Sequence, residues 1–265
     1  MHAPGAATTL DVSGTRRIPF GRLTAVELRK SADTRAGRWL IGLTAGIALV
    51  ADFLIAIIVA NQDEALAYGD QVDGAAFVCS VLLPILGIML VTSEWSQRTA
   101  MTTFTLEPRR MRIVLAKMVA GILLTAFVIV FALVVGVVSY LLYGALGGTL
   151  DWTFGWRAFF AFIATQTLAM LGGFALACLL LNTPASIVVF FVYKWVLPGL
   201  FALGAALLAW FDDLAPWLDF QSAQGVLFDG PMDGSDWTHL VVSGFLWLIV
   251  PLVIGLWRIR RAEVK

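Results

Sequence analysis

The stretch from Glu94 to Lys117, EWSQRTAMTTFTLEPRRMRIVLAK, concentrates side chains that can form ion pairs and hydrogen bonds. It holds two carboxylates, five cations and a run of hydroxyl groups, and it lies between two long apolar runs. Glu94 and Arg98 stand four residues apart, the spacing at which a Glu followed by a cation pairs on a helix. These residue types suit recognition of another polypeptide through charges and hydroxyls. We therefore expect the segment to be a docking element.

Motifs for catalysis are missing from the sequence. It contains neither the phosphate-binding pattern G-x-x-x-x-G-K-[ST] nor the zinc-binding pattern H-E-x-x-H. The two histidines, His2 and His239, are far apart, and no nucleophile can be matched with a base on one face. Cys79 and Cys178 lie in apolar runs without neighbouring metal ligands and are expected to be small core residues. We expect no catalytic residue, no metal site and no cofactor bound by this chain.

The composition sets the environment in which such a docking element must work. The chain has 265 residues, of which 60% are hydrophobic and 14% are charged, with a mean hydropathy of +0.87. Soluble domains are about half apolar and about a quarter charged. The sequence therefore predicts an all-α membrane protein, with no nucleic-acid partner.

Six apolar runs are each long enough to cross a hydrocarbon core of about 30 Å as a helix. The second contains Pro84, which is expected to kink its helix. A helical segment outside the membrane is expected before the sixth run, with WLDF and QGVLF as short helical pieces. The predicted spans are residues 39–60, 76–93, 113–143, 156–181, 185–211 and 239–257.

Two polar tails flank the six-span domain, which covers residues 39–257. Residues 1–18 are rich in Gly, Ala, Thr and Ser and are expected to be a disordered cytoplasmic tail. Residues 19–38 are rich in cations and are expected to form an interfacial helix, with Asp33 or Thr34 capping the next helix. Residues 258–265 are expected to be a second cytoplasmic tail.

The cations indicate the orientation. The chain up to Arg38 carries seven Lys or Arg, the loop 94–112 carries four, and the C-terminal tail carries four. The segments 61–75, 144–155 and 212–238 carry none and hold eleven of the eighteen acidic residues. Because cytoplasmic loops are enriched in Lys and Arg, we expect a multi-pass protein of the cell membrane with both termini and the 94–112 loop in the cytoplasm.

Within that loop two interpretations apply to different residues. The part up to about residue 106 is expected to be a short helix ended by Pro108, with its contact residues at Glu94, Arg98, Thr99, Thr102, Thr103 and Leu106. The remaining cations suit the membrane surface, where they bind anionic lipid headgroups. This second group comprises Arg29, Lys30, Arg109, Arg110 and Arg112.

Two ionisable residues lie inside the predicted spans. Asp52 is in the first span and Lys194 is in the fifth, at depths that differ by roughly 4–5 Å at 1.5 Å per residue. Each isolated charge costs on the order of 2.5–3.5 kcal/mol in the membrane. They either pair with each other or line a water-filled substrate pathway. Gly172-Gly173 and Pro198-Gly199 could be hinges, but we favour a close-packing role for them, because small residues let membrane helices approach one another.

A resemblance combines these features. The chain looks like a permease subunit of the type-2 ABC exporters, on the segment ELRK before the first span and the order Glu94, Arg98-Thr99, Pro108, Arg109-Arg110-Arg112, Lys117. It covers residues 20–260. It implies a cytoplasmic coupling helix between spans 2 and 3 and extracellular helices before span 6. It also implies a separate ATP-binding subunit that carries ATP and Mg²⁺.

The resemblance leads to the expected function. We expect a permease that pairs with a second identical or similar copy and with ATP-binding subunits to export a substrate. Residues 94–108 would pass closure of those subunits to the spans. The alternative is a non-transporting membrane scaffold or binding protein. An intramembrane enzyme is a more distant third.

Overall fold

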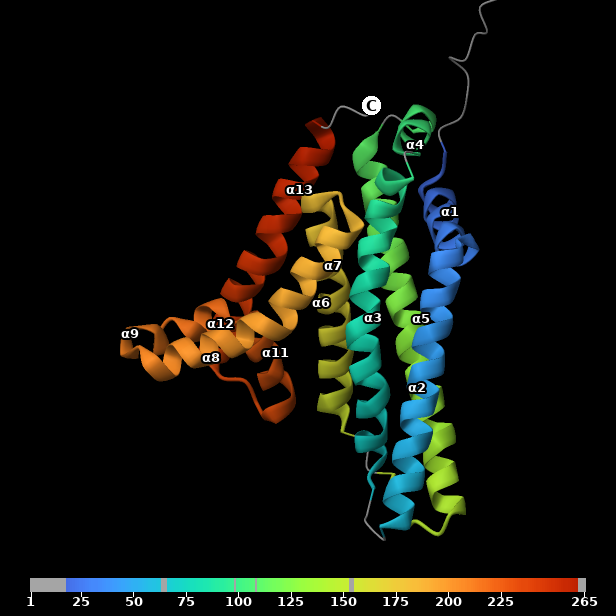
Figure 1. Ribbon diagram of the computed structural model, residues 1–265, viewed down its shortest axis with the longest axis vertical. Helices are drawn as coiled ribbons and strands as arrows, with labels where there is room; N and C mark the ends of the chain where they lie inside the picture. The colour runs from blue at the N-terminus through green and yellow to red at the C-terminus, as the bar shows by residue number, and fades with distance from the viewer. Residues whose placement is uncertain (1–17, 63–65, 98, 108, 153–154, 262–265) are drawn as a thin grey trace, which may run out of the picture.

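The computed structural model describes residues 18–62, 66–97, 99–107, 109–152 and 155–261, and these parts of the chain are almost entirely helical (Figure 1). They contain no β-strand, only an isolated bridge between Ala67 and Asp151. The α-helices are α1 (Phe20–Asp33), α2 (Arg35–Asn61), α3 (Tyr68–Ser96), α4 (Ala100–Leu106), α5 (Arg110–Ala145), α6 (Trp156–Leu180), α7 (Thr183–Phe191), α8 (Leu197–Leu207), α9 (Ala209–Asp212), α10 (Ala215–Leu218), α11 (Phe220–Asp229), α12 (Gly234–Gly244) and α13 (Val250–Arg261). Two π-helical turns interrupt the series, η1 (Val192–Val196) and η2 (Phe245–Ile249).

Six helical segments among the described residues are long and apolar enough to cross a membrane, as expected of a multi-pass helical protein. Their positions match the six predicted spans to within a few residues. The main differences are at the fifth segment, which stops at Leu207 because Leu208 is extended, and at the sixth, which begins earlier. The segments are Gly37–Asn61, Gly74–Ser96, Arg110–Ala145, Trp156–Leu180, Thr183–Leu207 and Gly234–Arg261.

The junction between α1 and α2 is tight. Thr34 is the N-cap of α2 and its hydroxyl accepts the Gly37 N–H at 3.1 Å, as predicted for one of the two candidate caps. A Cβ at Gly37 would collide with the backbone oxygen of Ser31. The predicted interfacial segment 19–38 is therefore divided, because its last residues already belong to the helix of the first span.

Helix α3 lies at the centre of the bundle and packs against α2, α5 and α6 (Figure 1). A Cβ at Gly173 would lie 2.5 Å from the Pro84 oxygen, and one at Gly87 would lie 2.6 Å from the Met170 oxygen. These glycines let the backbones of α3 and α6 approach closely. The contact agrees with a packing role at Gly173, and α3 is helical through Pro84.

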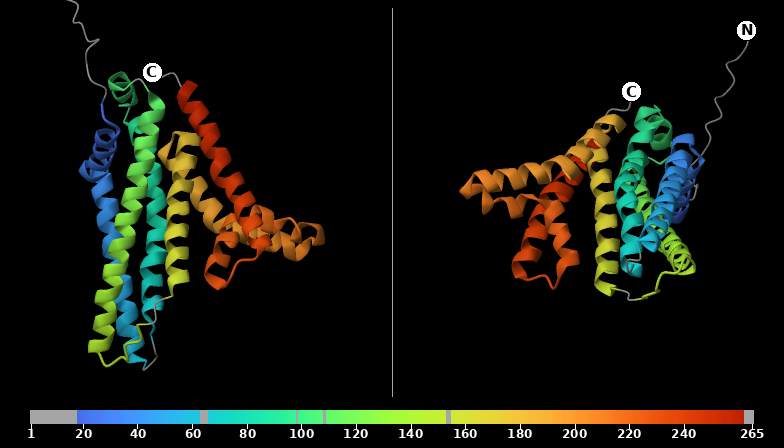
Figure 2. Two further views of the ribbon diagram at one scale, coloured as in Figure 1. Left: turned by 180° about the vertical axis from the view of Figure 1, so that it is seen from behind. Right: turned by 60° about the horizontal axis from the view of Figure 1, so that its bottom comes forward.

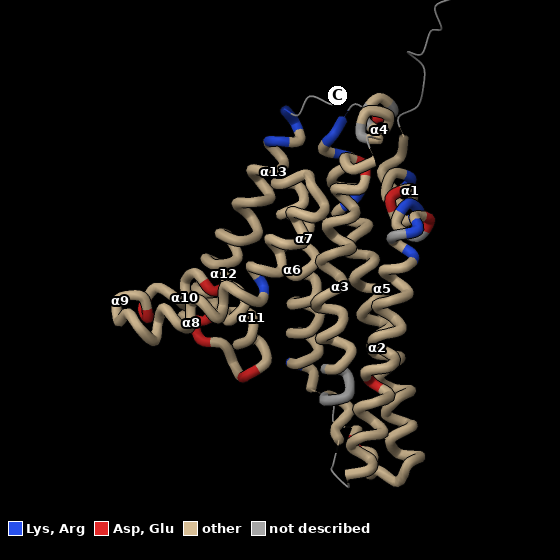
Figure 3. Tube along the Cα trace, viewed as in Figure 1, with Lys and Arg blue, Asp and Glu red and all other residues tan. Residues whose placement is uncertain are grey.

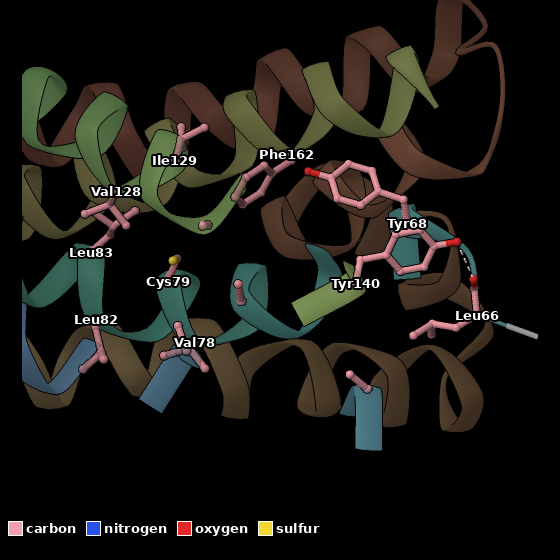
Figure 4. Close-up of a cluster of buried hydrophobic side chains, with 14 of the residues drawn as sticks. Leu66, Tyr68, Val78, Cys79, Leu82, Leu83, Val128, Ile129, Tyr140 and Phe162 are labelled. Atoms are coloured by element: carbon pink, nitrogen blue, oxygen red, sulfur yellow. Dashed lines mark hydrogen bonds between the residues drawn. The ribbon is translucent and has the colours of Figure 1, made fainter. Parts of the chain in front are cut away.

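The core between these helices is apolar. Figure 4 shows part of it, where Cys79 and Leu83 of α3 lie near Val128 of α5 and Phe162 of α6. Tyr140 lies at one end of the cluster, where its hydroxyl donates a hydrogen bond to the Leu66 oxygen at 2.9 Å. Cys79 and Cys178 are both free and buried, as expected of small core residues.

The segment from η1 to α12 leaves the bundle at an angle (Figures 1 and 2). Pro198, near the start of α8, cannot donate a backbone hydrogen bond to the preceding turn, and the helix passes through the π-helical turn η1 just before it. A Cβ placed on Gly199 would have no neighbouring atom within 4 Å. Close packing therefore does not explain Gly199, in contrast to Gly173.

Short helices fill the acidic segment before the sixth span, as predicted. The predicted QGVLF piece lies in α11, whereas the predicted WLDF piece is broken at Asp219, between the end of α10 and the start of α11. Asp219 caps α11 by accepting the N–H groups of Gln221 and Ser222, both at 3.0 Å. Trp247 of η2 donates its indole N–H to the Leu218 oxygen at 2.7 Å. This bond ties the projecting segment to the last span.

Candidate functional site

Glu94 lies at the end of α3 and points into the protein. Its side chain is 8% exposed. Its Oε1 accepts a hydrogen bond from Nζ of Lys30 at 2.8 Å and lies 3.2 Å from Nζ of Lys117. The predicted partner, Arg98, lies outside the described residues. The prediction assumed a solvated surface pair, but the carboxylate of Glu94 is buried and has its cations on α1 and α5.

Glu27 of α1 completes the arrangement. Its Oε1 accepts Lys30 at 2.8 Å and its Oε2 accepts Lys117 at 2.7 Å, and Lys117 also donates to the Leu90 oxygen at 2.9 Å. The side chains of Glu27 and Lys117 are 6% and 5% exposed. We call Glu27, Lys30, Glu94 and Lys117 the charged cluster. Its two carboxylates and two ammonium groups balance, which offsets the cost of burying each one.

The local sequence of α1 explains how Glu27 enters the interior. Thr24 and Glu27 are buried and Ser31 is half-buried, so polar residues at helical spacing lie on the inward face. Glu27 and Lys30, three residues apart, are neighbours on that face. The inward positions of α1 are therefore partly polar.

Lys30 is the most accessible member of the charged cluster, with 43% of its side chain exposed. Partial burial lowers the pKa of Lys30, but the hydrogen bonds and charges of Glu27 and Glu94 raise it by more, so its pKa lies above the ordinary value of 10.5. Lys30 is therefore protonated at neutral pH and the cluster keeps its charge balance.

Helix α4 lies over this end of the bundle (Figure 1). Thr103 donates its hydroxyl to Glu94 Oε1 at 3.1 Å, so a single carboxylate oxygen contacts α4, α1 and α5. Met101, Thr102 and Thr105 of α4 are exposed. Thr99 precedes the helix and is also exposed, and Leu106 is the last residue of α4.

Two of the arginines predicted to bind lipid headgroups have partners within the protein. Arg112 donates to Glu107 Oε2 at 2.7 Å and to the Ile18 oxygen at 2.8 Å. Arg110 donates to the Ile259 oxygen at 2.8 Å, near the end of α13. These bonds hold the starts of α1 and α5 and the end of α13 together.

The other predicted headgroup ligands are more open. Arg109 is exposed, and Arg29 lies 3.7 Å from Asp33 on the outer side of α1. Lys and Arg as a class gather at the end of the bundle where α1, α4 and the end of α13 lie (Figure 3). Binding of lipid by these residues stays a prediction.

A cavity of about 640 Å³ lies beneath α1 and α4. Its apolar wall includes Leu23, Leu86 and Leu90, and its polar wall includes Glu27 and Glu94 of the charged cluster. Thr99, Thr102 and Thr103 also line it, so together with Glu94 four predicted contact residues of the 94–106 segment surround one space.

Asp52 and Lys194 are not brought together. Asp52 is fully buried on α2, where its carboxylate oxygen lies 2.8 Å from the position of a Cβ at Gly74 of α3. Lys194 lies on η1, with Nζ 5.7 Å from the centre of the Trp195 ring. The ion pairs between described residues do not include one that joins Asp52 to Lys194. The reason is that η1 begins the segment that leaves the bundle, while α2 lies on the other side of α3 (Figure 1).

Comparison with known proteins adds no family to this geometry. Neither a protein-family model nor a curated protein matches the chain. The charged cluster therefore has to be interpreted from its own chemistry. Sequence reasoning included Glu94 among the contact residues and named Glu27 and Lys117 only as parts of motifs. The available signal was Lys117 itself, because an ionisable residue within an apolar run requires a partner.

Proposed function

We propose that this protein is the permease subunit of an ATP-driven exporter of the type-2 ABC class, with α4 as the helix that contacts a separate ATP-binding subunit. The observation that carries the proposal is the bond from Thr103 of α4 to Glu94, an oxygen shared with Lys30 and Lys117. Through this oxygen, a movement of α4 would be transmitted to α1, α3 and α5 together.

The stiffness of this connection follows from burial of the charges. Removing one partner of a buried ion pair costs about 3–5 kcal/mol, because an uncompensated charge is left behind. The charged cluster therefore resists separation of α1, α3 and α5. Movement of α4 would then displace these helices as a unit, as in rigid-body switching.

The remaining parts of the proposal concern partners and orientation. ATP and Mg²⁺ would be held by the partner chain, and this chain would form the export pathway with a second copy of itself or a similar permease. The concentration of cations near α1 and α4 supports a cytoplasmic location for that end, and α9–α11 would then be extracellular. The plasma membrane is the corresponding location.

The test uses the tagged full-length protein, purified in mild detergent from membranes of the cells that produce it naturally. We expect an ATP-hydrolysing chain with a phosphate-binding loop to co-purify. Thr105→Asp, at an exposed position of α4 outside the lining of the cavity, should lower the co-purified ATPase activity about fivefold, the effect of roughly 1 kcal/mol at an interface.

The matched control is Thr238→Asp, which makes the same change at an exposed threonine in the second turn of α12. Thr238 is exposed and lies far from α4 in the chain, so the variant should fold and retain the ATPase. Equal loss in both variants, or no loss with Thr105→Asp, would contradict the role of α4. Absence of any ATP-binding chain would favour the scaffold alternative.

A further inference from the structure

The cavity beneath α1 and α4 changes in polarity along the direction of the spans. Along α3 its lining runs from Leu86, Met89 and Leu90 to Ser93 and Glu94 near the helix end, and Gln97 follows just after the helix. Apolar side chains thus lie deeper along the span, and polar ones lie toward the end that carries α4. An amphiphile has the same division between its hydrocarbon chain and its headgroup.

Among the charged residues that line the cavity, one cation is available to bind a ligand. Its three carboxylates, Glu27, Glu94 and Glu107, each have a cation within 2.8 Å in the charged cluster or on α5. Arg22 also lines the cavity, is exposed, and takes part in no ion pair among the described residues. The space therefore offers an uncompensated guanidinium beside paired carboxylates.

Neutral donors surround the same end. The side chains of Gln97, Thr99 and Thr102 line the cavity next to the half-exposed Lys30. A guanidinium, hydroxyls and an amide are the donors that bind phosphate oxygens through charge-assisted hydrogen bonds. The volume of about 640 Å³ lies in the range of sites that bury small-molecule ligands.

We propose that this cavity binds one acyl chain of an anionic phospholipid, with the phosphate held at Arg22 and the neighbouring donors and the chain against Leu86 and Leu90. The site lies at the membrane-surface end of three spans, so a lipid reaches it without leaving the bilayer interface. A soluble phosphate would satisfy the donors but would leave the apolar wall without a ligand. This site does not depend on the proposed export activity.

The experiment is a lipid titration of the purified full-length protein, monitored by native mass spectrometry. The probes are phosphatidylglycerol, phosphatidylcholine with the same chains, and glycerol 3-phosphate. We expect one phosphatidylglycerol per chain to be retained at concentrations where the other two probes dissociate. Comparable binding of phosphatidylcholine would overturn the assignment of an anionic ligand. Comparable binding of glycerol 3-phosphate would overturn the assignment of a lipid.

Two pairs of variants separate this site from general attraction to the membrane surface. Arg22→Ala should weaken phosphatidylglycerol binding about fivefold to tenfold, whereas Arg35→Ala, at the exposed start of α2 outside the cavity lining, should not. Surface attraction alone predicts equal losses, since each surface cation contributes about 1 kcal/mol. Equal losses would therefore overturn the proposal.

The second pair tests the space itself. Ser93→Trp places an indole in the cavity and should abolish retention, while Ser96→Trp, at an exposed position of the same helix outside the lining, should preserve it. Thermal unfolding of each variant, measured alongside, shows that the protein is folded. Undiminished retention in a folded Ser93→Trp protein would place the lipid elsewhere.

Discussion

Replacing Lys117 with methionine tests the charged cluster most directly. The change preserves an unbranched side chain of similar length and removes the ammonium that contacts Glu27 at 2.7 Å, Glu94 at 3.2 Å and the Leu90 oxygen at 2.9 Å. What is left is two buried carboxylates with Lys30 as their remaining cation within the cluster, and hence one uncompensated negative charge.

The magnitude follows from that imbalance. Breaking a buried pair by removing one partner costs about 3–5 kcal/mol. For a chain of this size, each kcal/mol lowers Tm by roughly 2–4 °C, so Lys117→Met should unfold at a temperature ~10 °C lower than the wild type. The double variant Lys117→Met with Glu27→Gln restores the charge balance and should recover part of the loss. The interaction energy between the two sites should be about 0.5–3 kcal/mol.

The assay is thermal unfolding in detergent, monitored by the helical circular dichroism signal. Lys194→Met is the matched control, because the nearest described partner of that ammonium is the Trp195 ring at 5.7 Å. Its Tm should change by much less than that of Lys117→Met. The reasoning is refuted if Lys117→Met has the same Tm as the wild type. It is also refuted if the free-energy changes caused by the Lys117 and Glu27 substitutions are additive in the double variant.

Three further predictions concern other parts of the chain. Gly173→Ala should destabilise by about 1–3 kcal/mol because its Cβ would meet the Pro84 oxygen, whereas Gly199→Ala, with open space around it, should leave Tm unchanged. Asp219→Ala removes the N-cap of α11 and should cost about 0.5–2 kcal/mol, measured as faster hydrogen exchange in α11 than in the wild type. Because the folded-state pKa of Lys30 is raised, its contribution is fully present below the ordinary value of 10.5 and is lost only as pH rises through the higher folded value. The Tm difference between wild type and Lys30→Gln should thus stay constant between about pH 7 and about pH 9, and a difference that disappears within that window would contradict the pairing.

The sequence predicted those features that depend on nearby residues. Six apolar runs of sufficient length became six helical segments, and a threonine before a helical run became the N-cap of α2. The sequence favoured close packing at Pro198-Gly199, but Gly199 has open space around it, and the projecting segment is tied to the last span through the bond from Trp247 to Leu218. Local signals carry no information about the direction in which α8 leaves the bundle.

Partner choice in the charged cluster could not be predicted from spacing. The separation of Lys117 from Glu27 is 90 residues, and that of Lys30 from Glu94 is 64 residues. The nearest sequence candidate for Glu94 was Arg98, and a helical spacing rule selects the near residue even where the carboxylate points inward. Asp52 and Lys194 illustrate the same limit, since similar depth in the membrane does not place two residues on adjacent helices.

The charged cluster also has a consequence for biosynthesis. Glu27 and Lys30 are synthesised first and balance each other, and Glu94 then enters at the end of the second span with a second negative charge. Balance returns only when Lys117 arrives with the third span. A nascent chain that stops between these two residues carries an unmatched carboxylate at the membrane, so the first three spans should become resistant to extraction as one unit, at the moment when the third is inserted.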